Sequence, residues 1–289
     1  MTQQEKKELR MLVRTMYDYQ DMRTRTANRL RMKSDQTPMD DGCMDEMVIS
    51  DRHYEAIEQT RAIVQDLEKK IEGEIAKAVK IHPLFKEFTL NVLGCGPTMT
   101  GVILSEFDIY KADTVSKLWQ YAGLNPGEVR GKRIIKSENL KASHEIIKEY
   151  KNLKGEKCMI VLTDELIRGD KLTAGFVSPY NIWLRTKLIG VLAGSMIKQK
   201  GRESNGRRNY AVEFYYPYKN RLENSSREVK HGKFMVPWKD VSNGHRDAAA
   251  KRYMIKMFLQ DLYVAWRNIA GLPTRVPYAE EYLGKVHSA

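Results

Sequence analysis

The stretch Leu93-Gly94-Cys95-Gly96-Pro97-Thr98 decides the fold that we expect for this chain. It has the form hydrophobic-Gly-x-Gly, a tight turn that joins two helices in a helix-hairpin-helix. Its glycines permit positive φ and let the backbone come close to a phosphate. Pro97 fits the first position of a helix, where the missing N–H would have no partner. An ordinary Gly-Pro turn between two helices is the alternative.

The helix after the turn would point unpaired N–H groups and the positive end of its dipole at the same place. Two threonines put hydroxyl groups in its first turn. We therefore expect a contact with a nucleic-acid phosphate, which fixes position rather than sequence. The residues expected to make it are Gly94, Gly96, Thr98 and Thr100.

Apolar residues at helical spacing predict a mainly α fold on both sides of the turn. Residues 3–33 and 51–80 are each predicted to form one long helix, and the second has a stripe close to a heptad repeat. The pair suggests an antiparallel helical hairpin or a coiled-coil arm that pairs copies of the chain. Two ordinary helices packed on a core are the alternative. Further helices are expected over residues 98–107, 114–122, 137–150, 180–198 and 245–270.

These elements suggest three segments: a helical arm over 1–82, a helix-hairpin-helix domain over 83–199, and a basic, aromatic segment with a final helix over 200–289. Within them, residues 125–136 are expected to form a basic loop, with its cationic residues over 130–136. Residues 158–162 form either a short buried strand or the start of a helix. Residues 200–243 are the least regular stretch.

The charge of the chain favours a polyanionic partner. Its 289 residues include 49 Lys and Arg against 37 Asp and Glu, which gives a net charge of +12. Nucleic acid is the first partner that such a charge suggests, and an acidic membrane surface is the second. A merely soluble basic protein is the alternative.

Three other basic features could contact phosphates or bases: the loop over 130–136, the stretch before the aromatic residues 210–218, and the start of the last helix. The alternatives are a solvated loop, aromatic residues packed under a loop and an ordinary helix end. For the aromatic residues, packing is the favoured interpretation. The candidate residues are Arg130, Lys132, Arg133, Arg207, Arg208, His245 and Arg246.

No catalytic, metal or cofactor site is expected. Cys43, Cys95 and Cys158 are far apart and form no CxxC pair, and free thiols suit a reducing compartment. Asp164-Glu165 is the one carboxylate pair at a potential strand end, and a single pair does not make a metal site. The acidic residues over 40–46 are assigned to turns and caps.

A cytoplasmic protein without a membrane segment is expected. The first residues contain no apolar run of the kind that a signal peptide needs. The most apolar stretch, residues 188–197, is too short to span a bilayer.

The turn and the residues after it resemble a known family. Leu93-Gly94-Cys95-Gly96-Pro97-Thr98-Met99-Thr100-Gly101, continued by Leu118-Trp119-Gln120-Tyr121-Ala122-Gly123-Leu124-Asn125-Pro126, resembles the C-terminal domain of the Piv/MooV insertion-sequence transposases of the IS-one-ten type. Residues 177–186 look like a later segment of that domain, which adds Arg185 to the nucleic-acid-binding candidates. Residues 12–30 are similar to the family's coiled-coil region, and residues 133–175 look like an insertion.

Two departures from the family bear on activity. The family's RuvC-like domain, whose Asp and Glu residues bind metal, has no counterpart in this sequence. The family's nucleophilic serine lies in a Ser-Gly pair, where this chain has Arg130-Gly131. Ser137 and Ser178 do not lie where that nucleophile is expected.

The expected function is that of a transposase-derived DNA-binding protein without strand transfer of its own, which forms homo-oligomers through its arm. A working recombinase that uses Ser137, Ser178 or a RuvC-like partner chain is the first alternative. A binder of structured RNA is the second, because the family is associated with a guide-like RNA. A coiled-coil scaffold with no nucleic-acid role is the third.

Overall fold

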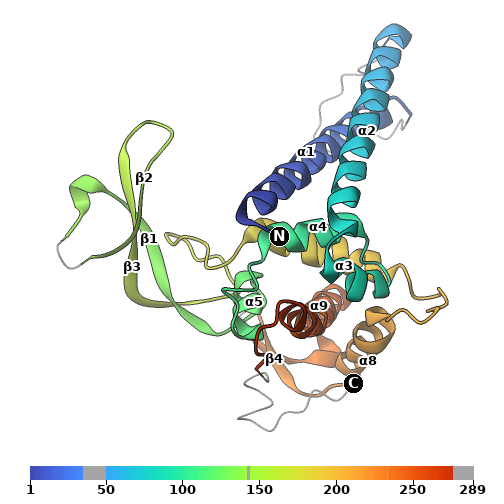
Figure 1. Cartoon of the computed structure of the whole chain (residues 1–289). Helices are drawn as coiled ribbons and strands as arrows, with labels where there is room; N and C mark the ends of the chain where they lie inside the picture. Colours follow the sequence, from blue (N-terminus) through green and yellow to red (C-terminus); the bar gives the residue numbers. More distant parts are fainter. Residues whose placement is uncertain (35–49, 142–143, 233, 276–289) are drawn as a thin grey trace. The chain divides into compact units, whose positions relative to one another are not determined.

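The computed structural model describes residues 1–34, 50–141, 144–232 and 234–275 (Figure 1). The acidic residues over 40–46 that were assigned to turns and caps, and Cys43 among them, lie outside the described residues. Most of the described residues are helical, as expected, but two antiparallel sheets are present as well. The chain divides into two compact units, residues 1–86 with 97–106, and residues 87–96 with 107–289.

The N-terminal unit is built on two long helices, α1 (Gln3–Ser34) and α2 (Asp51–Lys80), which confirm the two predicted helices. They run side by side in opposite directions (Figure 1). Apolar residues at spacings of three and four are buried along the contact, as the helical period requires. They are Leu9, Val13, Met16, Leu30, Val64, Ile75 and Val79.

Two short helices complete this unit, α3 (Pro83–Glu87) and α4 (Pro97–Glu106). As predicted, Pro97 is the first residue of its helix. A Cβ atom at Gly101 would lie 2.8 Å from Cγ2 of Ile75, so this glycine permits α4 to pack closely on α2. Glu106 is buried at the end of α4, and Arg14 donates to its carboxylate at 2.7 Å.

The C-terminal unit is built around α9 (Asn243–Ile269), which confirms the predicted last helix. α5 (Val115–Tyr121) and α8 (Tyr216–Glu223) pack against it. The indole Nε1 of Trp119 donates to the carbonyl oxygen of Lys256 at 3.1 Å. The buried side chains of α9 are Met254, Ile255, Met257, Phe258, Leu259, Leu262, Tyr263 and Trp266.

α5 ends within one residue of the end predicted for this helix. Gly123 has φ of +69°, and the N–H of Leu124 donates to the carbonyl oxygen of Trp119 at 2.7 Å. This is the hydrogen bond of a Schellman cap, which needs a residue that tolerates positive φ.

A further helical run covers residues 182–197, close to the predicted helix over 180–198. It consists of α6 (Ile182–Thr186), the π-helix η3 (Lys187–Leu192) and α7 (Ala193–Ile197). A π turn has one more residue than the α turn that it replaces. A second π segment, η4 (Ala211–Tyr215), leads into α8. The stretch over 200–243 is therefore more regular than its composition predicted.

The sheet corrects two predictions. Residues 130–136 are not a loop, because they belong to β1 (Glu128–Lys136), and residues 137–150 are not a helix. The latter contain a single 3-10 turn, η2 (Ser137–Asn139), and then β2 (Glu145–Lys151). Residues 158–162 lie in β3 (Lys157–Arg168), which resolves that alternative in favour of a strand. β3 is the central strand, and β1 and β2 pair with it antiparallel on either side (Figure 1).

The physical reason is that β1 and β2 are edge strands of a small sheet. Their side chains stay largely in solvent, so few apolar residues are needed and the strand period is weak. The buried side chains of the sheet come mainly from β3, namely Cys158, Met159, Val161 and Ile167.

The smaller elements are a β hairpin and two 3-10 turns. The hairpin pairs β4 (Glu228–His231) with β5 (Phe234–Pro237), and the turns are η1 (Thr89–Asn91) and η5 (Trp238–Asp240). None of the described helices combines the length and the apolar character that crossing a membrane requires.

Candidate nucleic-acid interface

The two glycines of the turn before α4 have different surroundings. Gly94 has φ of +86°, and a Cβ atom there would lie 2.8 Å from both N and Cα of Met196. Because Gly94 has no side chain, the backbone of α7 can pack directly against it. Gly96 is exposed, and a Cβ atom there would meet nothing within 4 Å. Of the two, Gly96 is the one that leaves room for a ligand.

The two threonines of α4 also differ. Thr98 is half-buried, so part of its surface remains accessible to solvent. Thr100 is completely buried, with 0% of its surface exposed, so its hydroxyl cannot reach a phosphate in this structure. The expectation for Thr100 failed because its position on α4 belongs to the face that packs inside the N-terminal unit.

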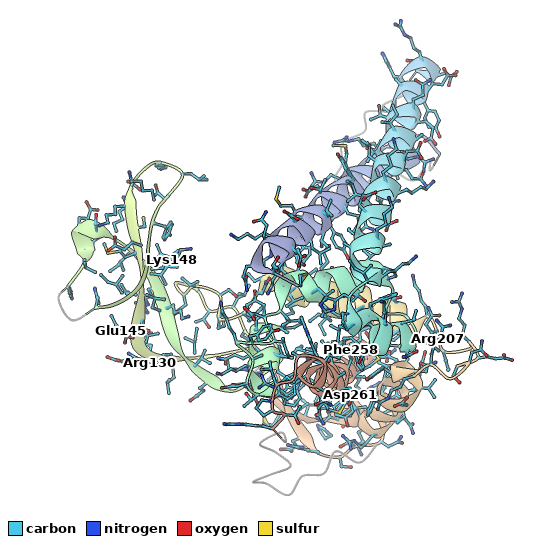
Figure 2. All side chains as sticks on the ribbon, in the orientation of Figure 1. Arg130, Glu145, Lys148, Arg207, Phe258 and Asp261 are labelled. Atoms are coloured by element: carbon cyan, nitrogen blue, oxygen red, sulfur yellow. The ribbon has the colours of Figure 1, made fainter. Side chains whose placement is uncertain are left out.

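The arginines of β1 are neutralised by carboxylates. Arg130 donates to Asp164 at 3.1 Å and to Glu145 at 3.5 Å, and Figure 2 shows Arg130 and Glu145 on the same part of the sheet. Arg133 donates to Glu165 at 2.8 Å, and its guanidinium lies 4.4 Å from the ring centre of Phe176. Asp164 and Glu165 are thus the carboxylates that pair with these two arginines.

A lysine face remains on the sheet, which we define as Lys132, Lys148 and Tyr150. In the strand register, Lys132 is opposite Leu162, Lys148 is opposite Ile160 and Tyr150 is opposite Cys158. Alternate residues of β3 point to one side, so all three side chains lie on the same side of the sheet. Both lysines are exposed, and the structure records no ion pair for either within the part of the chain it describes.

Lys148 is a residue that sequence reasoning missed. Residues 145–151 place two isoleucines together and then two charged residues, so the sequence has no strand alternation there that could have revealed it. Figure 2 shows Lys148 on β2, the strand that the predicted helix over 137–150 excluded.

The two arginines before the aromatic residues differ in whether a carboxylate pairs with them. Arg207 is exposed on a loop, as Figure 2 shows. Arg208 donates to Asp261 at 2.6 Å and to Glu213 at 2.7 Å, so its charge is already matched. The hydroxyl of Tyr210 donates to the same Asp261 oxygen at 2.6 Å. Burial raises the pKa of Asp261, and the hydrogen bonds from Tyr210 and Arg208 act in the opposite direction.

The aromatic residues confirm the favoured interpretation of packing. Tyr210, Phe214 and Tyr215 are buried. The ring of Tyr210 meets Phe258 of α9 edge to face at 5.5 Å. These rings stabilise the C-terminal unit and are not open to bases.

Hydrogen bonds within the chain already engage the residues at the N-terminus of α9. The hydroxyl of Ser242 accepts from the N–H of His245 at 3.4 Å and caps the helix. Arg246 donates to the carbonyl oxygens of Lys239, Trp238 and Val241, which closes the preceding turn. His245 is half-buried, and burial lowers its pKa, with Arg252 and His231 adding to the effect.

Arg185 of α6 is partly engaged. Its Nη1 donates to the backbone oxygen of Asp170 at 2.6 Å, and its guanidinium lies 4.9 Å from the ring centre of Tyr180. Its other donors have no recorded partner among the residues that the structure covers. Arg185 is therefore held in one place and still able to bind an anion.

The structure thus leaves five of the predicted residues open to a nucleic acid and adds one. The open positions are Gly96, Thr98, Lys132, Arg185 and Arg207, with Lys148 as the addition. Within the described ranges, no group of three or more His, Cys, Asp and Glu residues could hold a metal ion. Cys95 and Cys158 are buried, and neither forms a disulfide within the described residues.

The two serines considered as nucleophiles have ordinary surroundings. The hydroxyl of Ser178 donates to the carbonyl oxygen of Tyr180 at 2.8 Å. Ser137 is exposed at the start of η2.

Comparison with models of known families and with curated proteins finds no match for this chain.

Proposed function

We propose that this chain is a DNA-binding protein that holds the phosphate backbone through cationic side chains of its C-terminal unit. The observation that carries the proposal is the lysine face, where Lys132 and Lys148 are exposed on one side of the sheet without a recorded carboxylate partner in the described ranges. Lysine ammonium groups that neutralise phosphates release counterions from DNA, which is the main source of sequence-independent affinity.

The charge of the whole chain and the turn at Gly96 support the same function. A net charge of +12 attracts a polyanion over several ångströms and raises its rate of association. The exposed Gly96 leaves space where a phosphate could approach the backbone.

The resemblance to transposases supplies the origin that we propose. A domain derived from a transposase would still bind DNA after strand-transfer activity is lost. The α1–α2 arm would pair copies of the chain. Sedimentation equilibrium of the purified protein measures that pairing, and a monomer at all concentrations would contradict it.

The proposal is tested by fluorescence anisotropy with a short DNA duplex over a series of salt concentrations. We expect tight binding at low salt that weakens steeply as salt is added. Lys132→Gln should reduce affinity about fivefold and lower the slope of log affinity against log salt by about one.

The matched control is Lys157→Gln in β3 of the same sheet. It removes the same charge, but Lys157 already pairs with Glu149 at 3.0 Å, so we expect less than a twofold effect. No detectable binding at low salt would overturn the proposed function. Equal losses in the two variants would show that the lysine face makes no direct contact.

A further inference from the structure

The three-stranded sheet has one covered side and one open side. On the covered side, a Cβ atom at Gly131 would lie 2.4 Å from the ring of Phe176, and the guanidinium of Arg133 lies over the same ring. The odd-numbered residues of β3 share that side, because Arg133 is opposite Val161 in the register. Those that are buried are Met159, Val161 and Ile167.

The open side, which we define as the even-numbered residues of β3 and the residues opposite them, carries exposed apolar side chains. Ile134 is 55% exposed and Leu166 is 61% exposed. Ile160 and Leu162 are half-buried, and only Cys158 of these β3 residues is buried. Apolar side chains that gather on an accessible face are typical of a surface that binds a partner.

The lysine face lies on this open side, so cationic and apolar side chains are interleaved there. Lys148 and Ile134 are opposite Ile160 from the two edge strands. Tyr150 follows two residues after Lys148 and points to the same side. Its side chain is half-buried, and the structure records no hydrogen bond or ring contact for it among the residues that it describes.

The charge of the open side fits a polyanion. Lys136 on that side already pairs with Glu156 at 2.9 Å. Lys132 and Lys148 are exposed, and neither has a carboxylate partner in the described ranges. A second copy of this chain seated on the same surface would bring these ammonium groups together, and like charges across an interface disfavour association.

We propose that the open side of the sheet binds single-stranded DNA. Tyr150 stacks on a base, and Ile134 and Ile160 contact further bases. Lys132 and Lys148 bind the phosphates between them. A single strand alternates anionic phosphates with accessible base faces, whereas a duplex hides those faces in its stack and would leave the apolar side chains without a partner. The inference rests on the proposed function and narrows the partner from DNA to its single-stranded form.

Fluorescence anisotropy of the full chain tests the preference, with a thymidine strand of about 12 nucleotides and a duplex of the same length. Thymidine strands form no stable internal pairing, so the bases remain accessible. We expect the single strand to bind about tenfold more tightly than the duplex at the same salt concentration. Lys132→Gln should weaken both complexes, because phosphates are present in both.

Tyr150→Ala separates stacking from charge. It should weaken binding of the thymidine strand about tenfold and change duplex affinity less than twofold, whereas Tyr150→Phe should keep the affinity of wild type for both. The matched control is Tyr110→Ala, which removes a tyrosine that is 71% exposed and lies outside the sheet, so we expect no change. Ile134→Thr keeps a β-branched strand residue and removes an exposed apolar contact, and should weaken single-strand binding about threefold.

Circular dichroism melts show whether each variant is folded, and Ile134→Thr serves as the test if Tyr150→Ala is not. Equal affinity of wild type for the two DNAs, or single-strand binding that neither sheet variant changes, would overturn this inference. Duplex binding that depends on Lys132 would then leave the proposed function intact. Absence of binding to either DNA at low salt would overturn both. An oligomer of wild type that Ile134→Thr dissociates would make the open side a contact between copies and would also overturn it.

Discussion

At the scale of single residues, glycines and arginines of similar sequence context have different roles in the structure. Gly94 and Gly96 both fit a phosphate-contacting turn, but a neighbouring backbone lies against Gly94 alone. Likewise Arg207 and Arg208 are adjacent, and only Arg208 is bound by carboxylates. These differences arise from residues far away in the sequence, such as Met196 and Asp261, so local patterns could not predict them.

The two glycines give a direct prediction. Gly94→Ala should lower the free energy of unfolding by at least about 2 kcal/mol, because alanine disfavours positive φ and its Cβ would meet the backbone of Met196. Gly96→Ala should change it by less than about 0.5 kcal/mol, because the site is open. Urea unfolding measures both values.

The same pair tests the turn as a ligand contact. If the backbone at Gly96 approaches a phosphate, Gly96→Ala weakens duplex binding while the protein remains as stable as wild type. Equal destabilisation by the two substitutions would contradict the difference in packing.

At the scale of elements, long amphipathic helices were predictable and edge strands were not. α1, α2 and α9 repeat apolar residues at helical spacing over many turns, and their predicted bounds agree with the structure within a few residues. β1 and β2 have little or no strand alternation, because their charged side chains point into solvent. The lysine face depends on this sheet, and it could not be predicted while its strands were assigned to a loop and a helix.

The short helix α3 gives a prediction about pH. Nδ1 of His82 accepts from the N–H of Leu84 at 3.1 Å, which caps the helix and requires a neutral imidazole. Burial lowers the pKa of His82 below 6.5, so the stability it contributes is complete above pH 6.5 and is lost as pH falls through the lowered pKa.

We expect the unfolding free energy of wild type to fall between neutral pH and about pH 5. His82→Asn keeps a capping acceptor that cannot be protonated in this range, so part of the fall should disappear. Urea unfolding of both proteins at the two pH values measures the difference. An identical pH dependence in the variant would exclude His82 as a source of the change.

At the scale of the whole molecule, composition predicted the balance of charge, and the structure shows where that charge is left unmatched. The excess of lysine and arginine was visible at once. Which of them remain open depends on ion pairs such as Arg130 with Asp164, residues 34 positions apart.

The charge predicts how the protein behaves during purification. Protein isolated at low salt should carry nucleic acid, detected by its absorbance at the ultraviolet maximum of bases, and a high-salt wash should release it. Digestion of the released material with deoxyribonuclease or ribonuclease identifies it. Material that resists deoxyribonuclease and yields to ribonuclease would replace DNA with RNA as the partner.

The π turn between α6 and α7 has a consequence for how the gene can change. Residues of an α-helix succeed one another at about 100° around its axis, so removing one residue from Lys187–Leu192 would turn everything after it by about that angle. Arg185 lies before this turn, and Met196, whose backbone rests against Gly94, lies after it. A single-codon deletion there would keep both residues but rotate Met196 about the helix axis relative to Arg185. The length of this segment is therefore constrained more tightly than the identity of its exposed side chains.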